Sequence, residues 1–575
     1  MKNLRLNIVL AVFFVLGAAM FSRLFFLQIL NSKFYKSQAL GQQAGFSEVQ
    51  GVRGEIFLKN SDETDGVMGT GDAISLAVNK EAWVVAAKPA EIEDKENFAE
   101  VLSIEIAETK DFVLSKISAN SSYIVIKKDI SANDISKIKA LNLKGLYWEK
   151  STKRYYPQKS LAANIIGFLG GNGLGQYGLE GYFEDVLKSE SGIKEQKRGL
   201  ALIGFKNDND LLDGADIYLT IDYDIQFEAE ALLKEAKQNL DIESGQIIVI
   251  KPDSGRILAM ASYPYFNPNE YSKETDLGVF QNSSVQKLFE PGSVMKPFTM
   301  AMGLNEGKVT PDTTFTDTGV VNIKKDAIYN FAHAKYGLQT MTQVLEKSIN
   351  TGAVFVEHTI PHKTFMDYLD KFGFGRKTEI DLQGEVYSKN ELLRRGGDME
   401  YATASFGQGI QVTPIQLVAA FSAIANGGTL YRPYVVEKIV RGEGAEEVTE
   451  PKIVEKEIIS QKTASEMRTM LTSVVEKGYP SVAKINGYYL AGKTGTAEVP
   501  YENKKGYYPD KTIQSFIGFG PSMDPQFLIL VKLDNPKVPK SSLSAVPLFK
   551  KLAQYIINYW QIPPDYDVTS QPTNN

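Results

Sequence analysis

The 575-residue chain contains no cysteine and only three histidines, and both shortages narrow its possible chemistry. Without thiols the chain cannot misoxidise outside the cytosol, which is compatible with export. His358 and His362 stand four residues apart, but Pro361 lies between them and no glutamate follows His358, so they do not form the zinc pair of a metalloprotease. A Gly-x-Ser-x-Gly elbow is also missing. We therefore expect no histidine-based triad, no metal site and no cofactor.

A strong positive charge is absent as well. Acidic residues outnumber Lys and Arg by 69 to 63, the formal net charge is −6, and no basic run occurs. This balance argues against a nucleic-acid partner. With 43% hydrophobic and 23% charged residues, the composition is that of an ordinary globular protein. The length predicts roughly two to four domains.

The longest uncharged hydrophobic segment lies at the N-terminus. Residues 6–22 carry no charge, and after Arg23 a second apolar stretch continues to Leu30. Arg23 can reach the headgroups with its long side chain, so about 20 residues are available to span a bilayer. The small residues 17–19 leave a cleaved signal peptide as the alternative, but the apolar character continues beyond them, which favours an uncleaved anchor. Basic residues flank the span on both sides, so the chemistry described below, not a charge bias, places the bulk of the chain outside.

The chain divides into two predicted modules and a tail. Residues 1–30 are expected to be a cytoplasmic stub and transmembrane anchor, and residues 31–205 a first module of mixed strands and helices. A polar stretch at residues 207–216 indicates a boundary, and the second module extends over residues 215–560. The polar residues 561–575 predict a frayed tail.

The second module begins and ends with predicted strands. The turn at residues 252–255 separates two apolar runs and predicts a hairpin. Strands at both ends with helices between them predict an α+β layer fold. The predicted strands are residues 217–221, 246–250, 256–260, 515–519 and 527–531, and the predicted helices are residues 179–188, 342–356 and 414–426.

Three short strings in a fixed order predict the chemistry. They are Ser293-Val294-Met295-Lys296, then Ser348-Ile349-Asn350, then Lys493-Thr494-Gly495-Thr496. A serine hydroxyl is a poor nucleophile without a neighbouring base. Lys296 follows Ser293 by three residues, so the two share a helical face. Burial and the second ammonium of Lys493 would lower the pKa of Lys296 towards that of a useful base. The strings therefore indicate a serine acyl-transfer site in which lysine handles the proton.

Each string by itself is a weak signal. The Ser-x-x-Lys spacing recurs at Ser136, Ser191, Ser284 and Ser481, and Ser-x-Asn recurs at Ser118, Ser131 and Ser388. Lys-Thr-Gly occurs once. The order and context of the three strings carry the prediction, because short motifs often arise by chance.

The other residues of the strings complete the predicted site. We expect Ser348 on a loop at a helix start, where it relays a proton between Lys296 and the leaving amine. Asn350 both donates and accepts, so it can hold the lysine and a substrate amide.

The third string is expected on an edge strand that lines the cleft. Gly495 would let a ligand approach the backbone closely, and the hydroxyls of Thr494 and Thr496 would bind a substrate carboxylate. The backbone N–H groups of Ser293 and Thr496 would form an oxyanion hole.

Two nucleotide-binding patterns also occur. Residues 487–494 fit the phosphate-loop pattern, but Tyr488, Tyr489 and Leu490 favour a strand where a turning backbone is needed. Residues 173–178 match a dinucleotide fingerprint, but no clear βαβ unit follows, so they predict a structural turn.

Together with longer strings, these motifs resemble class B penicillin-binding proteins over nearly the whole chain. The resemblance implies an α+β fold: an N-terminal transmembrane helix, a mixed α/β pedestal of the dimerisation type, and a C-terminal transpeptidase domain. Such a domain is similar to serine β-lactamases, with an antiparallel sheet flanked by helices plus a helical subdomain. The supporting strings are residues 23–29, 53–56, 178–182, 289–293, 405–410 and 412–414.

The resemblance implies a peptidoglycan D,D-transpeptidase. Ser293 would be acylated by the penultimate D-alanine of a stem peptide, and the acyl group would pass to the amine of a neighbouring stem. β-Lactams would acylate the same serine. The implied partners are stem peptides, β-lactams, the cell membrane crossed once with the catalytic domain outside the cytoplasm, a lipid-II polymerase, and other division or elongation proteins.

The strings at residues 348–350 and 407–410 lean towards the septal, cell-division type over the elongation type. Residues 57–60 depart from the Asp-Arg-Asn-Gly turn common after residues 53–56, which leaves the pedestal open in detail but not the chemistry.

Two alternatives remain. A D,D-carboxypeptidase or β-lactamase would use the same site and pass the acyl group to water. A non-catalytic scaffold or antibiotic sensor would bind without turnover. The anchor and the long pedestal favour transpeptidation, because a hydrolase need not be held at a set height above the membrane. The complete set of site residues favours turnover.

Overall fold

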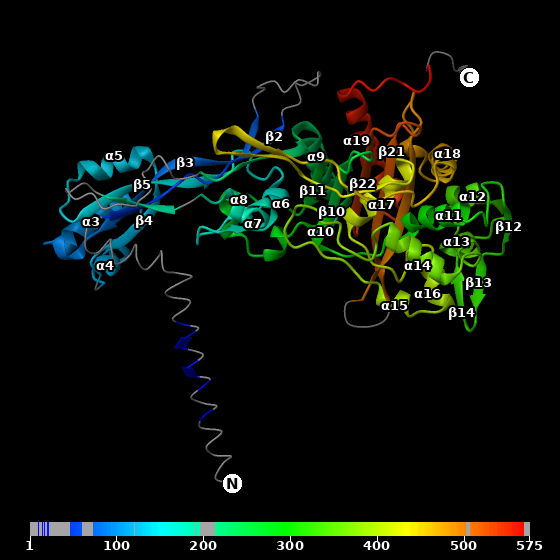
Figure 1. Cartoon of the computed structure of the whole chain (residues 1–575), viewed down its shortest axis with the longest axis horizontal. Helices are drawn as coiled ribbons and strands as arrows, with labels where there is room; N and C mark the ends of the chain where they lie inside the picture. The colour runs from blue at the N-terminus through cyan, green and yellow to red at the C-terminus, as the bar shows by residue number, and fades with distance from the viewer. Residues whose placement is uncertain are drawn as a thin grey trace, which may run out of the picture. The chain divides into compact units, whose positions relative to one another are not determined.

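The computed structural model describes residues 10, 14, 16–17, 20–21, 23, 46–59, 73–119, 121–189, 191–195, 213–501 and 506–567 (Figure 1). By internal contacts the chain divides into two compact units. Unit 1 comprises residues 1–54, 185–215 and 441–445, and unit 2 comprises residues 55–184, 216–440 and 446–575. In unit 1, β1 (Phe46–Gln50) pairs antiparallel with β8 (Ser191–Glu195).

The predicted anchor at residues 6–30 falls mostly outside the described residues. Within the described part of the chain, no helix combines the length and the apolar character needed to cross a bilayer.

A five-stranded antiparallel sheet forms the centre of the C-terminal part of unit 2. Its strand order is β11-β10-β22-β21-β20, so β20 is an edge strand. The predicted strands at residues 246–250, 256–260, 515–519 and 527–531 are confirmed, and so is the hairpin of β10 and β11. The strand bounds are β10 (Ser244–Ile250), β11 (Ile257–Tyr263), β20 (Ala491–Pro500), β21 (Tyr507–Gly520) and β22 (Phe527–Asp534).

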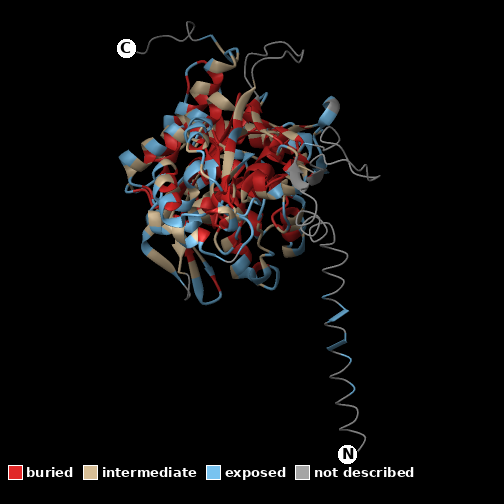
Figure 2. Ribbon diagram, turned by 90° about the vertical axis from the view of Figure 1, so that its left-hand side faces the viewer, coloured by how far each residue is buried: buried red, intermediate tan, exposed pale blue. Residues whose placement is uncertain are grey.

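Helices cover both faces of this sheet. Phe516 of β21 packs its ring against Phe549 of α19 (Ala545–Tyr559) at 4.6 Å between ring centroids. Phe519 of the same strand packs against Phe421 of α17 (Pro414–Ala425) at 6.2 Å. Residues three apart on a strand point to opposite faces, so α19 and α17 lie on opposite sides of the sheet. Beside α19, α9 (Tyr223–Leu240) joins the same apolar core. Figure 2 shows buried residues gathered inside the ribbon, with exposed residues around them.

A second, seven-stranded sheet connects residues far apart in the sequence. Its order is β18-β17-β9-β2-β3-β4, with β5 also pairing with β3. β9 runs parallel to β2 and antiparallel to β17, so it has a partner on each side. The strand bounds are β2 (Ile56–Lys59), β3 (Ile74–Ala87), β4 (Ile124–Ile130), β5 (Leu146–Tyr155), β9 (Asp216–Asp222), β17 (Val436–Arg441) and β18 (Ala445–Val448). The predicted strand at residues 217–221 is therefore confirmed as β9.

Three helices pack on the β3–β5 part of this sheet around a separate apolar core. Each begins with a polar N-cap side chain that accepts a backbone N–H, which replaces a hydrogen bond the first turn lacks. The helices are α3 (Lys95–Glu105), α4 (Lys110–Ile117) and α5 (Ala132–Ala140), capped by Asp94, Thr109 and Ser131.

Two helix predictions were wrong in extent. Residues 342–356 form two helices, α12 (Met341–Glu346) and α13 (Asn350–Glu357), because Ser348 between them adopts a left-handed backbone with φ of 55°. Residues 179–188 likewise form the short helices α7 (Gly178–Tyr182) and α8 (Glu184–Leu187). The predicted helix at residues 414–426 is confirmed as α17.

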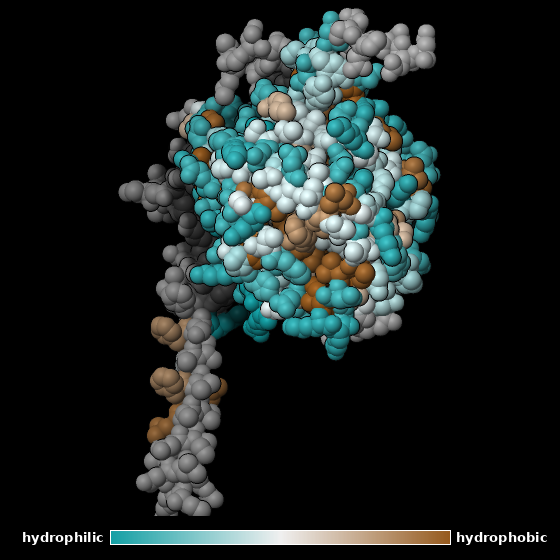
Figure 3. All heavy atoms as spheres, turned by 90° about the vertical axis from the view of Figure 1, so that its right-hand side faces the viewer, coloured by the Kyte–Doolittle hydropathy of each residue, from teal (hydrophilic) through white to brown (hydrophobic). Residues whose placement is uncertain are grey.

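Two small hairpins project beside α12 and α13. β12 (Thr314–Asp317) pairs with β15 (Gly337–Thr340), and β13 (Val320–Ile323) pairs with β14 (Asp326–Tyr329). Figure 3 looks onto the end that carries these strands and shows hydrophobic side chains grouped among hydrophilic ones. Phe331 and Leu338 of this region are 74% and 67% exposed.

Candidate active site

Ser293 lies in a tight helical turn that leads directly into a buried helix. The turn is a 3₁₀ segment (Gly292–Met295), and α11 (Lys296–Asn305) follows at once. Gly292 has φ of 57°, and a Cβ there would lie 2.9 Å from the carbonyl oxygen of Thr496. A left-handed backbone in so small a space requires glycine. Ser293 itself is half-buried, so its hydroxyl is held but accessible.

The predicted contact between nucleophile and base is present. Lys296 is 1% exposed, and its Nζ lies 3.0 Å from Ser293 Oγ. The same nitrogen lies 2.6 Å from the Ser348 carbonyl oxygen, 3.1 Å from Ser348 Oγ and 2.8 Å from Asn350 Oδ1. The first and second strings, 52 or more residues apart, thus meet at one amine.

These contacts suit an uncharged lysine. A neutral amine has two N–H donors and one lone pair, and the Ser348 carbonyl and Asn350 Oδ1 can only accept. The two N–H groups satisfy those oxygens, and the lone pair can accept a proton from the Ser293 or the Ser348 hydroxyl, which lie 3.0 and 3.1 Å away. Burial, and secondly the Lys493 ammonium, hold the pKa of Lys296 well below its usual range.

The break between α12 and α13 positions the second string. With φ of 55°, Ser348 turns both its carbonyl and its hydroxyl towards Lys296. Asn350 is the first residue of α13, and its Nδ2 donates to the Tyr329 carbonyl at 2.9 Å. The prediction of Ser348 on a loop at a helix start is confirmed.

The third string lies on the edge strand β20, as predicted. Lys493 is 1% exposed, and its Nζ donates to Ser348 Oγ at 2.9 Å. Burial lowers the pKa of Lys493 to about 7. Ser348 Oγ therefore lies between two buried amines and offers a path for a proton.

Thr494 and Thr496 alternate with Lys493 and Gly495 along the strand, and both threonines are partly exposed. Thr496 Oγ1 lies 3.0 Å from the hydroxyl of Ser541, a residue that no sequence motif indicated. Ser541 also donates to the Gly495 carbonyl, and it fixes this part of the strand.

The physical reason for Gly495 differs from the predicted one. A Cβ at Gly495 would lie 2.4 Å from Ser515 Oγ and 2.8 Å from Val294 Cγ2. Protein atoms, not an open cleft, occupy that space. Gly495 lets the nucleophile turn pack directly on β20.

Gly407 supports the nucleophile turn from the other side. Its carbonyl accepts the Gly292 N–H at 3.1 Å, and a Cβ on Gly407, which has φ of 87°, would lie 2.1 Å from the Gly292 carbonyl oxygen.

The competing motifs at residues 136–139, 173–178 and 487–494 lack this arrangement. Ser136 Oγ donates to the Ala132 carbonyl at 3.0 Å, and the Lys139 ammonium lies over the Trp83 ring. In the phosphate-loop pattern, Lys493 lies within β20, which continues as a strand to Pro500. Residues 173–178 lie at the hairpin of β6 (Phe168–Leu169) and β7 (Gly175–Gln176), a structural turn.

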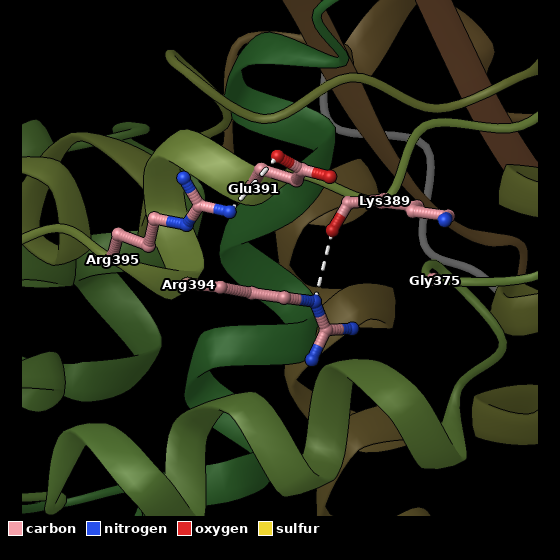
Figure 4. A pocket seen from close by; sticks show the side chains of 5 residues that line it. All are labelled: Gly375, Lys389, Glu391, Arg394 and Arg395. Carbon is pink, nitrogen blue, oxygen red and sulfur yellow. Dashed lines mark hydrogen bonds and ion pairs between the residues drawn. The ribbon is translucent and has the colours of Figure 1, made fainter.

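A cavity of about 370 Å³ lies in the helical part of unit 2, but it is not the predicted site. Its lining contains none of the residues in the three strings. Arg394 there donates to the Lys389 carbonyl, and Arg395 pairs with Glu391 (Figure 4). The lining residues are Gly375, Lys389, Glu391, Arg394 and Arg395.

Comparison with known proteins places the chain in a family. Residues 245–554 match the model of the penicillin binding protein transpeptidase domain, and residues 53–219 match that of the penicillin-binding protein dimerisation domain. The chain is 34% identical to stage V sporulation protein D of Bacillus subtilis over 507 residues, which cover 84% of this chain and 74% of that protein.

Two further similarities cover nearly the whole chain. It is 28% identical to PbpC of Pseudomonas aeruginosa, a probable peptidoglycan D,D-transpeptidase, over 98% of this chain and 96% of that one. A crystal structure of penicillin binding protein 3 from Mycobacterium tuberculosis, complexed with aztreonam, superposes with a TM-score of 0.70 at 24% identity. That superposition covers 92% of this chain and all of the other, 100%.

The fold and the family models define a penicillin-binding protein with a dimerisation module and a transpeptidase domain. The chain belongs to the class B penicillin-binding proteins. The predicted family is confirmed, and so is the predicted enzyme class, a serine-type D,D-transpeptidase. The mixed α/β fold is confirmed as well.

Proposed function

We propose that the protein cross-links peptidoglycan stem peptides through an acyl-enzyme on Ser293. The observation that carries this proposal is the contact of Ser293 Oγ with the buried Lys296 amine at 3.0 Å. An uncharged amine at that distance can take the hydroxyl proton as the oxygen attacks a carbonyl carbon.

The first half of the reaction transfers the donor stem to the enzyme. Ser293 Oγ forms a bond to the carbonyl carbon of the penultimate D-alanine, and its proton passes to Lys296. The backbone N–H groups of Ser293 and Thr496 bind the oxyanion of the tetrahedral intermediate. The C–N bond then breaks, a proton reaches the leaving amine through Ser348, and D-alanine departs.

The second half reverses the path with a new amine. The amine of a neighbouring stem attacks the Ser293 ester, and its surplus proton passes through Ser348 to Lys296. The Ser293–acyl bond then breaks, and Lys296 returns the proton to Ser293 Oγ. Asn350 holds Lys296 and a substrate amide. Lys493 supplies charge beside Ser348, and the hydroxyls of the partly exposed Thr494 and Thr496 bind the substrate carboxylate.

Gly495 belongs to the same substrate-binding strand, where its contribution is to keep the nucleophile turn close to β20. β-Lactams acylate Ser293 in place of the stem peptide. The similar penicillin binding protein 3 complexed with aztreonam supports this at the level of the fold.

The proposal extends to the place of the protein in the cell. Residues 1–30 form a cytoplasmic stub and a single membrane anchor, residues 31–205 the pedestal, residues 215–560 the transpeptidase domain outside the cytoplasm, and residues 561–575 a tail. The protein acts in cell division together with a lipid-II polymerase. The similar proteins include a peptidoglycan D,D-transpeptidase FtsI homologue of Mesostigma viride, 26% identical over 97% of this chain, which supports the transpeptidase activity.

Intact-mass spectrometry after penicillin treatment tests the proposal. One adduct per chain, mapped to the peptide that contains Ser293, is the expected result. Ser293→Ala should abolish it, and Ser136→Ala, with the same lysine spacing, should leave it unchanged. An adduct that persists in Ser293→Ala would refute the assignment. With a stem peptide and an amine acceptor, D-alanine release without a cross-linked product would favour hydrolysis.

A further inference from the structure

A buried carboxylate outside the three strings lies directly behind the second one. Asp317, at the end of β12, is 3% exposed. Its Oδ1 accepts from Thr351 Oγ1 at 2.6 Å, from the Gly319 N–H at 2.9 Å and from Asn330 Nδ2 at 3.0 Å. Its Oδ2 accepts from the Tyr336 N–H at 2.8 Å and from Asn330 Nδ2 at 2.9 Å. Every partner faces the carboxylate as a donor.

Asp317 accepts hydrogen bonds from the side chains of Thr351 and Asn330, and both of these residues are next to the Asn350 contact in the chain. Thr351 follows Asn350 in α13. Asn330 follows Tyr329, whose carbonyl accepts from Asn350 Nδ2. Asn330 Oδ1 in turn accepts the Thr351 N–H at 3.1 Å.

This network replaces the N-cap that α13 lacks. Ile349, at the cap position, makes no side-chain cap hydrogen bond. The first N–H groups of a helix have no partner within the helix and need one outside it. Asn330 supplies that partner for Thr351, and Asp317 fixes the orientation of Asn330. The start of α13 is thus set by residues of a neighbouring hairpin and loop.

We infer that Asp317 is a positioning residue for the active site: it ties residues 329–336 to the first turn of α13 and so holds Asn350 Oδ1 against Lys296. The inference rests on the proposed function of Ser293 and Lys296, but it assigns Asp317 no contact with substrate. The pKa of Asp317 is lowered: burial alone would raise it, but the hydrogen bonds from Thr351, Gly319, Tyr336 and Asn330 outweigh burial.

The variant Asp317→Asn tests the inference with little change in shape. An amide has one acceptor oxygen, so its NH₂ group must face donors on whichever side it takes. We expect the loop and α13 to separate, and a shift of about 1 Å in a catalytic group typically costs about 10²-fold in rate. The measurement is the acylation rate of the full-length protein by a fluorescent penicillin from pH 5.5 to 9.

The pH profile separates positioning from general destabilisation. When Asn350 withdraws, Lys296 loses an acceptor, and the charged amine loses more than the neutral one. The pKa of Lys296 should fall, and the acid limb of the profile should move to lower pH by about half a unit or more.

Asp381→Asn is the matched control. Asp381 is a buried carboxylate, 6% exposed, that accepts the N–H groups of Val435 and Val436 at 2.8 and 2.9 Å. Asp381→Asn should lower the melting temperature but leave the acid limb of the acylation profile at the wild-type pH. If Asp317→Asn and Asp381→Asn give the same profile, the inference is wrong.

A milder pair covers the case in which Asp317→Asn does not fold. Thr351→Val removes one donor to Asp317, and Thr351→Ser restores it. We expect Thr351→Val to acylate more slowly and to have its acid limb at lower pH than the wild type. Thr351→Ser should recover both the acylation rate and the position of the limb. Equal profiles for the two would also overturn the inference. Failure of the proposed function would be distinct, since the wild type would then lack a Ser293 adduct altogether.

Discussion

Removal of the Lys493 charge should move the titration of Lys296 in a predictable direction. Both amines contact Ser348 Oγ, at 2.9 Å from Lys493 and 3.1 Å from Lys296, so the two nitrogens lie at most about 6 Å apart. A second ammonium at that distance disfavours protonation of Lys296, and it is the second cause of the low pKa of Lys296 after burial. Lys493→Ala removes that repulsion.

The size of the effect follows from Coulomb's law. Two unit charges about 6 Å apart at an effective dielectric constant of about 20 repel by about 3 kcal/mol, which corresponds to about 2 pH units. Partial screening in the wild type makes this an upper value for the repulsion, whereas water that enters the vacated space favours the charged amine, so we expect a rise in the pKa of Lys296 of at least about one unit. Below its own pKa of about 7, Lys493 carries the positive charge that contributes to the lowered pKa of Lys296.

The assay is the pH dependence of acylation by a fluorescent penicillin. A base with a higher pKa is lost sooner on acidification, so the acid limb of Lys493→Ala should lie at least about one unit above that of the wild type. Lys493→Arg keeps the positive charge, so its acid limb should lie at the wild-type pH whatever the maximal acylation rate of this variant. A limb that stays in place or moves to lower pH in Lys493→Ala would refute the reasoning.

Three further perturbations have defined outcomes. Gly407→Ala should reduce penicillin acylation by at least about 10²-fold, because its Cβ displaces the Gly292 carbonyl and with it the nucleophile turn. Glu180→Gln should destabilise unit 2 by about 1.5–3 kcal/mol in thermal unfolding, because it weakens the charge-assisted hydrogen bond between the buried Glu180 and Arg154 side chains, 2.7 Å apart. Glu357 is fully buried, which raises its pKa to about 8. The pKa of Glu357 is higher in the folded than in the unfolded protein, so the free energy of unfolding falls as pH rises through the folded pKa. Between pH 7 and 8 the wild type should lose about 1 kcal/mol of its free energy of unfolding, and Glu357→Gln should not show this loss.

Each of these has a control. Gly307 has φ of 63° with no atom within 4 Å of an added Cβ, so Gly307→Ala should acylate normally. Glu93 pairs with Lys144 at the exposed surface, and Glu93→Gln should leave unfolding unchanged. The Glu357 prediction fails if the stability difference between the two proteins is the same at pH 7 and pH 8.

The sequence predicted best those features that depend on short spacings. Ser293 and Lys296 are three residues apart, and β10, β11 and β22 are short continuous apolar runs, so each leaves a signal within a few residues. The edge position of Lys493 followed from its strand-forming neighbours and the single Lys-Thr-Gly string.

Features set by distant contacts left no such signal. Ser348, whose backbone is left-handed, contacts Lys296 and Lys493 on other elements, whereas residues 342–356 by themselves have the pattern of one continuous helix. Asp317, Asn330 and Ser541 are ordinary loop or strand-end residues in the sequence, and only the fold brings them to the site. The reason for Gly495 was mistaken because Val294, which fills the space, lies about 200 residues away in the chain.

The central position of β9 has a practical consequence for anyone who wishes to isolate the catalytic half. A fragment that starts near residue 215 would keep β17 beside β9 but would lack β2. The backbone amides and carbonyls of β9 that pair with β2 would then be exposed as an unpaired strand edge. We expect such a fragment to self-associate through this unpaired edge of β9. A version that retains residues 55–59 on a short tether would only move the unpaired edge to β2, because β2 pairs with β3 on its other side, so the exposed edge must be covered up to β3 and beyond.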